Sequence, residues 1–325
     1  MKFVEITQPG GPEVLKISTG EKPTISDNEV LISVKAAGVN RPDILQRQGL
    51  YPMPKGVTNI PGLEISGVIQ SVGKDVVGFS VGDRVCALTN GGGYAEFCAV
   101  PVTQVLPIPE NLNFIEAAAI PETFFTVWAN LFDIGKASKD DVVLIHGGAS
   151  GIGTTALALC EALGIKALST VGHDDKVNLL SKYGEIINYK KVDFEKEVLS
   201  RTNGNGVDVI LDIVGAPYFN KNINLLKKDG RLVIIGYMGG RIVEQFDLQE
   251  VMLKRATISG STMRGRSPEE KQAIAKSLIE KVWPLIESGM CKPTIHKVFN
   301  LSDVVKAHET LDNGDHIGKV VLSLD

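Results

Sequence analysis

A glycine-rich loop in the middle of the chain has the residue types and spacing to hold phosphate. Gly148, Gly151 and Gly153 follow a G-x-x-G-x-G pattern, with the apolar run 142–146 before it and helix-forming residues after it. Glycines allow a tight turn and a close approach of the backbone to a pyrophosphate, which the free N–H groups of the following helix stabilise. The Gly-Lys-Ser/Thr ending of a Walker phosphate loop is absent. The segment predicts a dinucleotide site formed by Gly148, Ser150, Gly151, Ile152 and Gly153.

The type of dinucleotide depends on the residues at the end of the next strand. NAD sites usually place Asp or Glu there to bind the ribose hydroxyls. This strand instead ends Ser-Thr-Val-Gly at residues 169–172, with Lys176 four residues later and Tyr189 after the third strand. A lysine near the ribose can neutralise a 2′-phosphate, which favours NADPH. In the alternative interpretation Lys176 is a solvated helix residue and Asp174 and Asp175 repel a phosphate, which leaves NADH open.

Residues that could bind a metal are scattered along the chain. The four cysteines and five histidines show no spacing typical of zinc ligands, and Cys86 and Cys98 lie in strand-like runs that suit small core residues. We therefore predict that the protein binds no metal. Hydride transfer to an already electrophilic acceptor suits such a site better than alcohol oxidation, which a metal assists.

The elements that must position these residues change character along the chain. Short apolar runs separated by Gly, Pro, Asn and Asp predict a β-rich region up to about residue 120. Further on, strands and helices alternate, which predicts βαβ units and a parallel sheet. The expected strands of that sheet are 142–146, 167–171, 186–189, 207–212, 231–236 and 258–261. A capping box at Ser267 and Glu270 begins a long helix that Pro284 should kink or end.

This pattern predicts an α/β protein with an interrupted first domain. A doubly wound, parallel-sheet Rossmann domain, residues 122–260, is inserted between a β-rich domain, residues 1–121, and a C-terminal return to that domain, residues 261–325.

Several motifs are more specific than the glycine loop. They are Ala37-Gly-Val-Asn-Arg-Pro-Asp43, Gln46-Arg-Gln-Gly-Leu-Tyr51, Pro61-Gly-Leu-Glu-Ile-Ser-Gly67, Val81-Gly-Asp-Arg-Val85, Gly91-Gly-Gly-Tyr-Ala-Glu96 and Ala118-Ala-Ile-Pro121. Over essentially its whole length the chain resembles the zeta-crystallin-like quinone oxidoreductases, a zinc-free branch of the medium-chain dehydrogenase/reductase superfamily. The resemblance implies a GroES-like catalytic domain split around the Rossmann domain, with the active site in the cleft between them. In zinc-dependent relatives the Asn40 region carries a catalytic cysteine and the Leu63 position a histidine, and this chain has neither ligand.

The same resemblance assigns residues to parts of the site. Asn40, Asp43 and Tyr51 are expected to line the nicotinamide end as catalytic residues, and Asn40 and Tyr51 could hydrogen-bond a quinone oxygen. The cofactor contacts are expected from Gly172, His173, Lys176 and Tyr189 around the adenosine 2′-phosphate, from Gly236, Tyr237, Met238 and Gly239 near the nicotinamide ribose, and from Thr126, Ser261, Thr262 and Met263 beside the nicotinamide. The position of His173 is often Ser or Thr in relatives.

Composition limits the partners of the protein. The 325 residues carry a net charge of −4 and the pI is about 5.8, which argues against a broad nucleic-acid surface. No apolar run approaches the ~18 residues of a transmembrane helix, and the first residues lack a signal-peptide core. These features, with cysteines that suggest no disulfide framework, predict a cytoplasmic protein without a membrane partner. The last strand of the parallel sheet, 258–261, is a candidate edge for pairing in a homodimer.

Three functions fit these observations. The first is an NADPH-dependent quinone oxidoreductase that needs no strong general base. The second is an enone or 2-alkenal reductase of the same superfamily, for which Tyr51 is the candidate proton donor. The third is a non-catalytic protein that binds NADPH or RNA. A short-chain dehydrogenase is excluded because Tyr218 and Lys221 are three residues apart, whereas its Tyr-x-x-x-Lys motif needs four.

Overall fold

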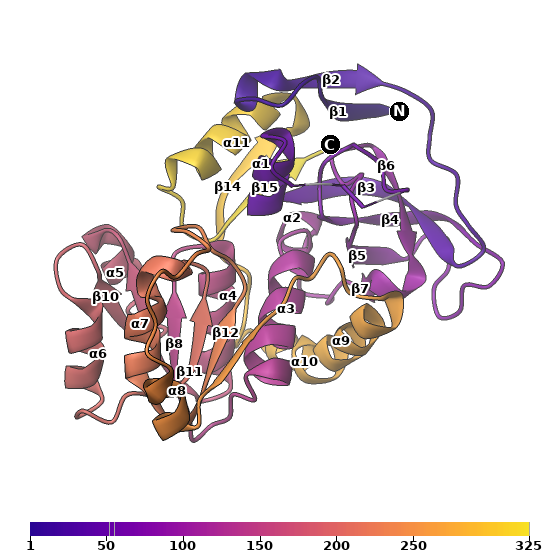
Figure 1. Ribbon diagram of the computed structural model, residues 1–325. Coiled ribbons are helices and arrows are strands. Elements are labelled where there is room, and N and C mark those ends of the chain that lie inside the picture. The colour runs from indigo at the N-terminus through magenta and orange to yellow at the C-terminus, as the bar shows by residue number, and fades with distance from the viewer. Residues whose placement is uncertain (52, 55, 325) are drawn as a thin grey trace. The chain divides into compact units, whose positions relative to one another are not determined.

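The computed structural model describes residues 1–51, 53–54 and 56–324. The chain divides into two compact units (Figure 1): Met1–Phe125 with Arg266–Asp325, and Thr126–Gly265. The first unit is discontinuous because β15 (Lys319–Ser323), near the C-terminus, pairs antiparallel with β3 (Glu29–Val39). The return of the chain to the first unit is therefore fixed by a β-ladder.

The first unit is built around a seven-stranded sheet and a small two-stranded sheet. The larger sheet has the order β14-β15-β3-β4-β5-β7, with β6 also pairing with β3, and the smaller one pairs β1 with β2. The strands are β1 (Lys2–Ile6), β2 (Leu15–Thr19), β4 (Glu64–Val72), β5 (Arg84–Leu88), β6 (Phe97–Pro101), β7 (Val105–Pro107) and β14 (Ile295–Asn300), besides β3 and β15. The helices are α1 (Arg41–Arg47), α2 (Phe114–Ala117), α9 (Pro268–Lys281), α10 (Trp283–Glu287) and α11 (Val304–Asn313), and α3 (Pro121–Val127) begins in this unit.

Alternation along β3 shows why this region forms a sheet over a core. Val30, Ile32 and Val34 are buried, whereas the residues between them are half-buried. A period of two places one set of side chains on the same face of a strand, and burying a Val or Ile side chain contributes ~1.5–3 kcal/mol. The register of β3 against β4, β6 and β15 is thus set by its apolar face.

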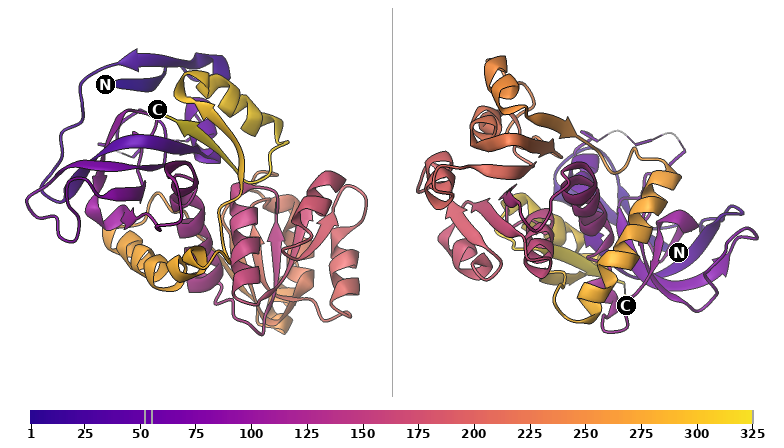
Figure 2. Two further views of the ribbon diagram at one scale, coloured as in Figure 1. Left: turned by 180° about the vertical axis from the view of Figure 1, so that it is seen from behind. Right: turned by 90° about the horizontal axis from the view of Figure 1, so that it is seen from below.

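The second unit contains a six-stranded sheet in the order β10-β9-β8-β11-β12-β13, and all of its strand pairs are parallel. The strands are β8 (Val142–His146), β9 (Lys166–Val171), β10 (Glu185–Asn188), β11 (Val207–Asp212), β12 (Leu226–Ile234) and β13 (Thr257–Gly260). The helices are α4 (Gly151–Ala162), α5 (Asp174–Leu180), α6 (Phe194–Arg201), α7 (Ala216–Leu225) and α8 (Leu248–Lys254), and a π-helical segment, Trp128–Ile134, continues from α3. Within this unit α6 packs on α7 and α7 on α8 along one face of the sheet (Figure 2).

This sheet matches the expected doubly wound pattern. The order reverses after β10, so that β8, β9 and β10 spread to one side and β11, β12 and β13 to the other. Five of the expected strands lie within one residue of the observed bounds, and β12 begins at Leu226, five residues earlier than expected. That extension follows α7 directly, in a lysine- and glycine-containing stretch whose composition does not indicate a strand.

The long helix near the C-terminus begins as its capping box predicts. The Ser267 hydroxyl accepts a hydrogen bond from the Glu270 N–H at 3.2 Å, and the Glu270 carboxylate accepts one from the Ser267 N–H at 2.7 Å. The helix ends at Lys281, and Pro284 lies in the first turn of α10, where a missing N–H costs no hydrogen bond. None of the helices in the described part of the chain has both the length and the apolar character to cross a membrane.

Candidate functional site

The glycine loop between β8 and α4 is packed so closely that side chains would not fit. A Cβ on Gly148 would lie 2.2 Å from the Ser169 Oγ, and a Cβ on Gly153 would lie 2.4 Å from the carbonyl oxygen of Gly147. Ser150 caps α4, since its Oγ accepts a hydrogen bond from the Gly153 N–H at 3.0 Å. The first-turn amides of Gly151 and Ile152 have no acceptor within the helix ladder. The loop therefore presents backbone N–H groups at a helix N-terminus, as a pyrophosphate requires.

Three polar side chains converge where β9 and β10 end. A Cβ on Gly172 would lie 3.1 Å from the Tyr189 hydroxyl and 3.4 Å from the Lys190 Cε. The Lys190 Nζ lies 3.3 Å from the His173 Nε2. A hydroxyl, an ammonium and an imidazole thus surround the residue that follows β9, which is suitable chemistry for a phosphate monoester.

The acidic residues of this region differ in how strongly they would repel a bound phosphate. The Asp174 carboxylate accepts a hydrogen bond from the Asn188 Nδ2 at 2.7 Å and pairs with the Lys191 ammonium, and the Lys191 hydrogen bond lowers the Asp174 pKa. Its charge is therefore neutralised locally. Lys176 is half-buried on α5, and Asp175 beside it is exposed.

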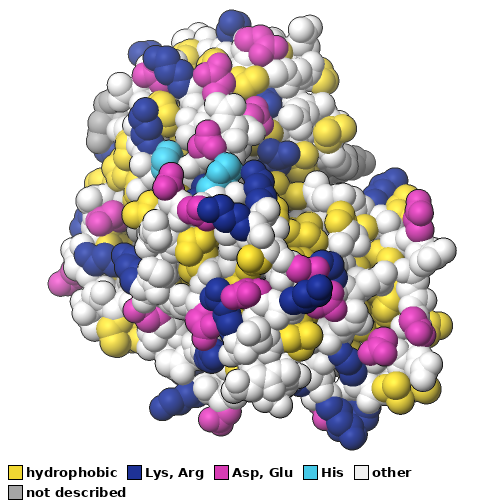
Figure 3. Space-filling view, turned by 90° about the vertical axis from the view of Figure 1, so that its left-hand side faces the viewer, with side chains coloured by type: hydrophobic (Ala, Val, Ile, Leu, Met, Phe, Trp, Pro, Cys, Tyr) yellow, Lys and Arg dark blue, Asp and Glu magenta, His cyan; other side chains and the backbone are white. Residues whose placement is uncertain are grey.

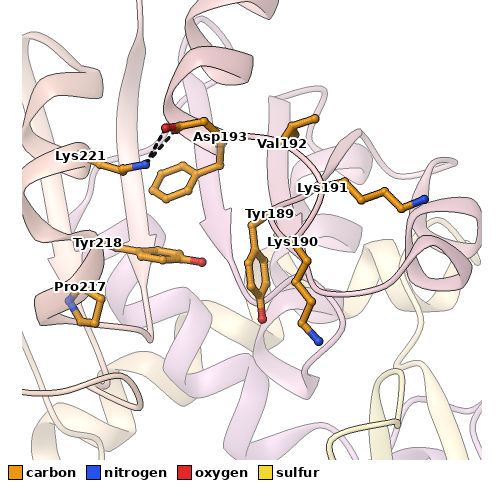
Figure 4. A pocket seen from close by; sticks show the side chains of 9 residues that line it. Tyr189, Lys190, Lys191, Val192, Asp193, Pro217, Tyr218 and Lys221 are labelled. Atoms are coloured by element: carbon orange, nitrogen blue, oxygen red, sulfur yellow. Dashed lines mark hydrogen bonds and ion pairs between the residues drawn. The ribbon is translucent and has the colours of Figure 1, made fainter.

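A pocket of about 570 Å³ lies next to these residues (Figure 4). Tyr189 and Lys190 line it with their polar ends directed to the same side, whereas Lys191 points away. Across the pocket the Tyr218 ring lies 6.2 Å from the Tyr189 ring in an edge-on arrangement. Lys221 is paired with Asp193 at 2.9 Å. The pocket therefore combines aromatic faces with the Lys190 ammonium at the carboxyl edge of the sheet.

The expected ribose-binding turn follows β12. Gly236 is half-buried, whereas Tyr237, Met238 and Gly239 are exposed. The Met238 N–H donates to the Ile213 carbonyl at 3.0 Å and the Gly239 N–H to the Val214 carbonyl at 2.8 Å. This turn is therefore held against the loop that follows β11.

Two of the residues expected beside the nicotinamide meet at a common partner. The buried Asn130 donates from Nδ2 to the Thr126 carbonyl at 2.8 Å and accepts from the Ser261 hydroxyl at 2.7 Å. Thr262 is exposed and Met263 is buried. The second unit thus brings Thr126 and Ser261 together, although they lie far apart in the sequence.

A separate polar network is buried in the first unit around Asn40. The Asn40 Nδ2 donates to the Glu64 Oε1 at 2.9 Å, and its Oδ1 accepts from the Lys319 ammonium. Lys319 also pairs with the Glu64 Oε1 at 2.5 Å, and the other Glu64 oxygen accepts from the Glu122 N–H at 2.8 Å. A Cβ on Gly38 would lie 2.0 Å from the Glu64 carboxylate, so the strand must carry glycine there. The Asn40 amide is therefore fixed by a buried ion pair.

Asp43 belongs to the same network through the backbone of Asn40. Its fully buried carboxylate accepts hydrogen bonds from the Asn40 N–H at 2.8 Å, the Gly62 N–H at 3.0 Å and the Tyr94 hydroxyl at 3.1 Å. Burial raises the pKa of Asp43 to about 6, against the opposing effect of these donors. Asp43 thus holds the backbone of the segment before α1 and of the turn before β4.

The third residue expected to be catalytic, Tyr51, follows α1 and is half-buried. In the ranges 1–51, 53–54 and 56–324, no three His, Cys, Asp or Glu side chains are grouped as metal ligands would be. The four cysteines are all buried, and none of them forms a disulfide.

Two residues that the sequence analysis did not single out are central to these arrangements. Lys190 follows the third strand of the sheet, and the signal that marks it is that residues after the carboxyl ends of neighbouring parallel strands lie at the same edge. Lys319 lies in the final strand, and only the pairing of that strand with β3 brings it to Asn40. No local sequence signal marks it.

Comparison with known proteins gives matches to both expected domains. A family model described as "Zinc-binding dehydrogenase" matches residues 151–280, and one described as "Alcohol dehydrogenase GroES-like domain" matches residues 26–110. The quinone oxidoreductase of Sus scrofa is 32% identical over 329 residues, which cover 100% of this chain and 98% of the relative.

Solved structures agree with this relationship. The structure of Escherichia coli quinone oxidoreductase complexed with NADPH matches with a TM-score of 0.87 at 28% identity, covering 99% of this chain and 100% of that one. The CurK enoyl reductase matches with a TM-score of 0.86 at 28% identity, covering 99% and 98%. The expected fold class, a Rossmann domain inserted in a GroES-like β-rich domain, is confirmed. The chain belongs to the zeta-crystallin-like quinone oxidoreductase family of the medium-chain dehydrogenase/reductases and is an oxidoreductase.

Proposed function

We propose that the protein is an NADPH-dependent quinone oxidoreductase. The observation that carries this proposal is the pairing of a close-packed glycine loop with a cationic cluster at the end of β9. The loop leaves no room for a Cβ at Gly148 or Gly153, and Lys190, His173 and Tyr189 gather around Gly172. These residues fit a dinucleotide that carries a 2′-phosphate. The E. coli relative, whose structure is complexed with NADPH, supports the same choice.

In this proposal different parts of the second unit bind different parts of the cofactor. The amides of Gly151 and Ile152 bind the pyrophosphate at the N-terminus of α4. Lys190, with Tyr189 and His173, neutralises the 2′-phosphate, and Lys176 on α5 stays a candidate for the same group. When bound, NADPH supplies the hydride. The turn 236–239 and the segment 261–263 are proposed to hold its ribose and nicotinamide.

The first unit is proposed to orient the acceptor. Because both Asn40 Nδ2 hydrogens have acceptors, in Glu64 at 2.9 Å and the Gly38 carbonyl at 3.4 Å, Asn40 supports the segment before α1 more readily than it binds a quinone. Tyr51 is proposed as the hydroxyl donor to a quinone oxygen as negative charge develops there. Asp43 holds the backbone of Asn40 and of the turn before β4.

The acceptor class is tested by following the loss of reduced-nicotinamide absorbance with NADPH and with NADH across quinones, enones and 2-alkenals. The proposal expects turnover with quinones and a preference for NADPH. Turnover with enals and none with quinones would identify the enone reductase instead, a function that the likeness to the CurK enoyl reductase favours. Tight NADPH binding without any acceptor turnover would support the non-catalytic alternative.

Cofactor preference is tested at Lys190. Lys190→Ala should reduce the preference for NADPH over NADH by about tenfold, because one charge-assisted contact to the 2′-phosphate is lost. Lys182→Ala removes the same charge from an exposed position of the same unit and serves as the matched control. An NADPH preference that survives in Lys190→Ala would show that the cluster after β9 does not bind the 2′-phosphate.

We also propose that the protein is a homodimer that pairs through β13. This strand is the last in the order of the six-stranded sheet. Large apolar side chains are exposed beside it, with Leu248 73% and Met252 68% exposed on α8 and Ile258 38% exposed on β13. A second copy would cover both the strand edge and these side chains. Met252→Asp should shift the sedimentation coefficient from that of a dimer to that of a monomer, and a monomeric unaltered chain would refute the proposal.

We propose a cytoplasmic location and no nucleic-acid partner. Four buried cysteines that form no disulfide suit a reducing compartment. On the face shown in Figure 3, basic and acidic side chains are interspersed without a continuous basic stripe, whereas nucleic-acid binding usually needs one. Fractionation of cells for the activity, and a filter-binding assay with RNA at physiological salt, test these two statements.

A further inference from the structure

A buried histidine lies immediately before the glycine loop and makes two side-chain hydrogen bonds. The His146 Nε2 lies 2.7 Å from the Asn222 Oδ1, and its Nδ1 lies 3.0 Å from the Thr170 Oγ1. Because the Asn222 oxygen only accepts, the His146 Nε2 carries the hydrogen and the Nδ1 accepts from the Thr170 hydroxyl. The neutral imidazole thus connects the last residue of β8 to the end of β9 and to α7.

The connection continues from Asn222 to the end of β11. The Asn222 Nδ2 donates to the Asp212 carboxylate at 3.2 Å. That carboxylate also accepts from the Val214 N–H at 2.7 Å and from the Gly215 N–H at 3.2 and 3.3 Å. Gly215 has a φ of +82°, so the turn is one that glycine favours and that the carboxylate holds in place.

This turn is fastened to the turn after β12 by main-chain hydrogen bonds. The Ile213 and Val214 carbonyls accept from the Met238 and Gly239 amides, and the Ala216 N–H donates to the Gly240 carbonyl at 2.9 Å. A Cβ on Gly215 would lie 2.5 Å from that same carbonyl oxygen, so the two turns are in direct contact. One chain of hydrogen bonds therefore spans the carboxyl ends of β9, β8, β11 and β12.

The histidine also supports the aromatic wall of the pocket in Figure 4. Its ring lies 4.9 Å from the Tyr218 ring and 5.1 Å from the Phe194 ring, in both cases edge-on. Both aromatic residues line the pocket. Tyr218 is therefore packed against the side chain that orders the loops.

We propose that His146, Asn222 and Asp212 are positioning residues that set the spacing of the loops at the carboxyl edge of the parallel sheet, so that the dinucleotide site is ordered before ligand binds. This inference rests on the proposed function for the identity of the ligand. None of the three side chains needs to touch that ligand, because the groups that they fix are the main-chain amides and carbonyls of residues 213–216 and 237–240. Ordering these turns in advance removes an entropy cost from binding.

The first test measures hydrogen exchange in the protein without ligand. Asn222→Ala leaves the His146 N–H without its acceptor and removes one donor from Asp212. We expect the Val214, Gly215, Met238 and Gly239 amides to exchange about tenfold faster, whereas amides in the centre of β12 keep their rate. Asn224→Ala, two residues further along α7 and exposed, is the matched control and should change nothing.

Unchanged exchange at the four amides of a folded Asn222→Ala protein overturns the inference. So does faster exchange spread evenly over the whole unit, because that result indicates general destabilisation. If Asn222→Ala does not fold, Thr170→Val replaces it, since valine keeps the shape and suits a parallel strand while removing the hydrogen bond to His146. That variant should accelerate the same amides.

The second test measures NADPH affinity by fluorescence titration. The dissociation constant should rise about tenfold in Asn222→Ala and about fivefold in Thr170→Val, and stay unchanged in Asn224→Ala. Faster exchange without a change of affinity would refute the positioning role. If the unaltered chain does not bind NADPH, the proposed function fails, and the exchange experiment alone then decides whether the network orders the turns.

Discussion

Replacing Lys319 with methionine should destabilise the protein strongly, because it leaves a carboxylate buried without its cation. Glu64 is 0% exposed and Lys319 is 3% exposed, and the two are paired at 2.5 Å. Methionine is one atom shorter than lysine and keeps an unbranched apolar stem. The change therefore isolates the loss of charge and hydrogen bonds from the loss of packing.

The magnitude follows from the partners that remain. In Lys319→Met the Glu64 carboxylate keeps the Asn40 Nδ2 at 2.9 Å and the Glu122 N–H at 2.8 Å, so it is hydrogen-bonded but not neutralised. Removing one member of a buried ion pair costs about 3–5 kcal/mol. The Asn40 Oδ1 also loses its donor, and we expect the total to lie at the upper end of that range.

Urea unfolding monitored by circular dichroism measures this loss. The double variant Lys319→Met, Glu64→Gln should recover most of it, because the buried charge disappears while the amide still fits the site. Lys306→Met, which removes an exposed partner of Asp303, is the control and should leave the midpoint unchanged.

Two results would refute this reasoning. A loss below about 1 kcal/mol in Lys319→Met would mean that water reaches Glu64 and that the pair behaves like an exposed one. A double variant as unstable as the single one would mean that the methionine does not fit, and that the lost charge is not the cause.

Two other outcomes are expected in the second unit. Burial lowers the pKa of His146 to about 4, so between pH 6.5 and 4 this histidine is protonated in the unfolded chain and neutral in the folded one. The free energy of unfolding should therefore fall by on the order of 3 kcal/mol as the pH drops through that window. Calorimetry of His146→Gln should show that this part of the pH dependence is removed. Gly153→Ala would place a methyl 2.4 Å from the Gly147 carbonyl oxygen. Thermal unfolding should therefore show a stability loss of ~1–3 kcal/mol, and titration should show a weaker affinity for NADPH. Gly265→Ala, whose methyl meets nothing closer than 3.5 Å, should leave both quantities unchanged.

Much of the second unit follows from local patterns in the sequence. An uninterrupted apolar run such as Val142–His146 is typical of a parallel strand buried on both faces, and the glycines after it leave few alternatives to a strand–loop–helix unit. The strand order also follows, since right-handed connections restrict how βαβ units assemble. The main error is at β12, whose first residue, Leu226, pairs with Val207 of β11 before the ladder resumes at Arg231, although the composition of residues 226–230 suits a turn.

The candidate site was less accessible to sequence reasoning because its organising side chains come from distant segments. Lys319 reaches Asn40 across 279 residues and His146 reaches Asn222 across 76. Neither spacing is a motif, and a histidine after an apolar run looks like any core residue. Asn40 and Asp43 could be named from their motif, but the motif does not say that their side chains are already engaged by other residues.

The two networks suggest that main-chain groups and side chains have different roles in a nucleotide site of this kind. The groups available to the pyrophosphate and ribose are amides and carbonyls, which every sequence supplies, so their chemistry carries little selectivity. The sequence instead controls where those groups lie, through buried side chains. The Asp212 carboxylate accepts hydrogen bonds from loop amides, and Asn222 donates to that carboxylate. Selectivity for the 2′-phosphate then falls to a few exposed side chains at the rim, of which Lys190 is the clearest. If this division holds, substitutions in the buried network should change affinity for NADPH and NADH equally, whereas Lys190→Ala should change their ratio.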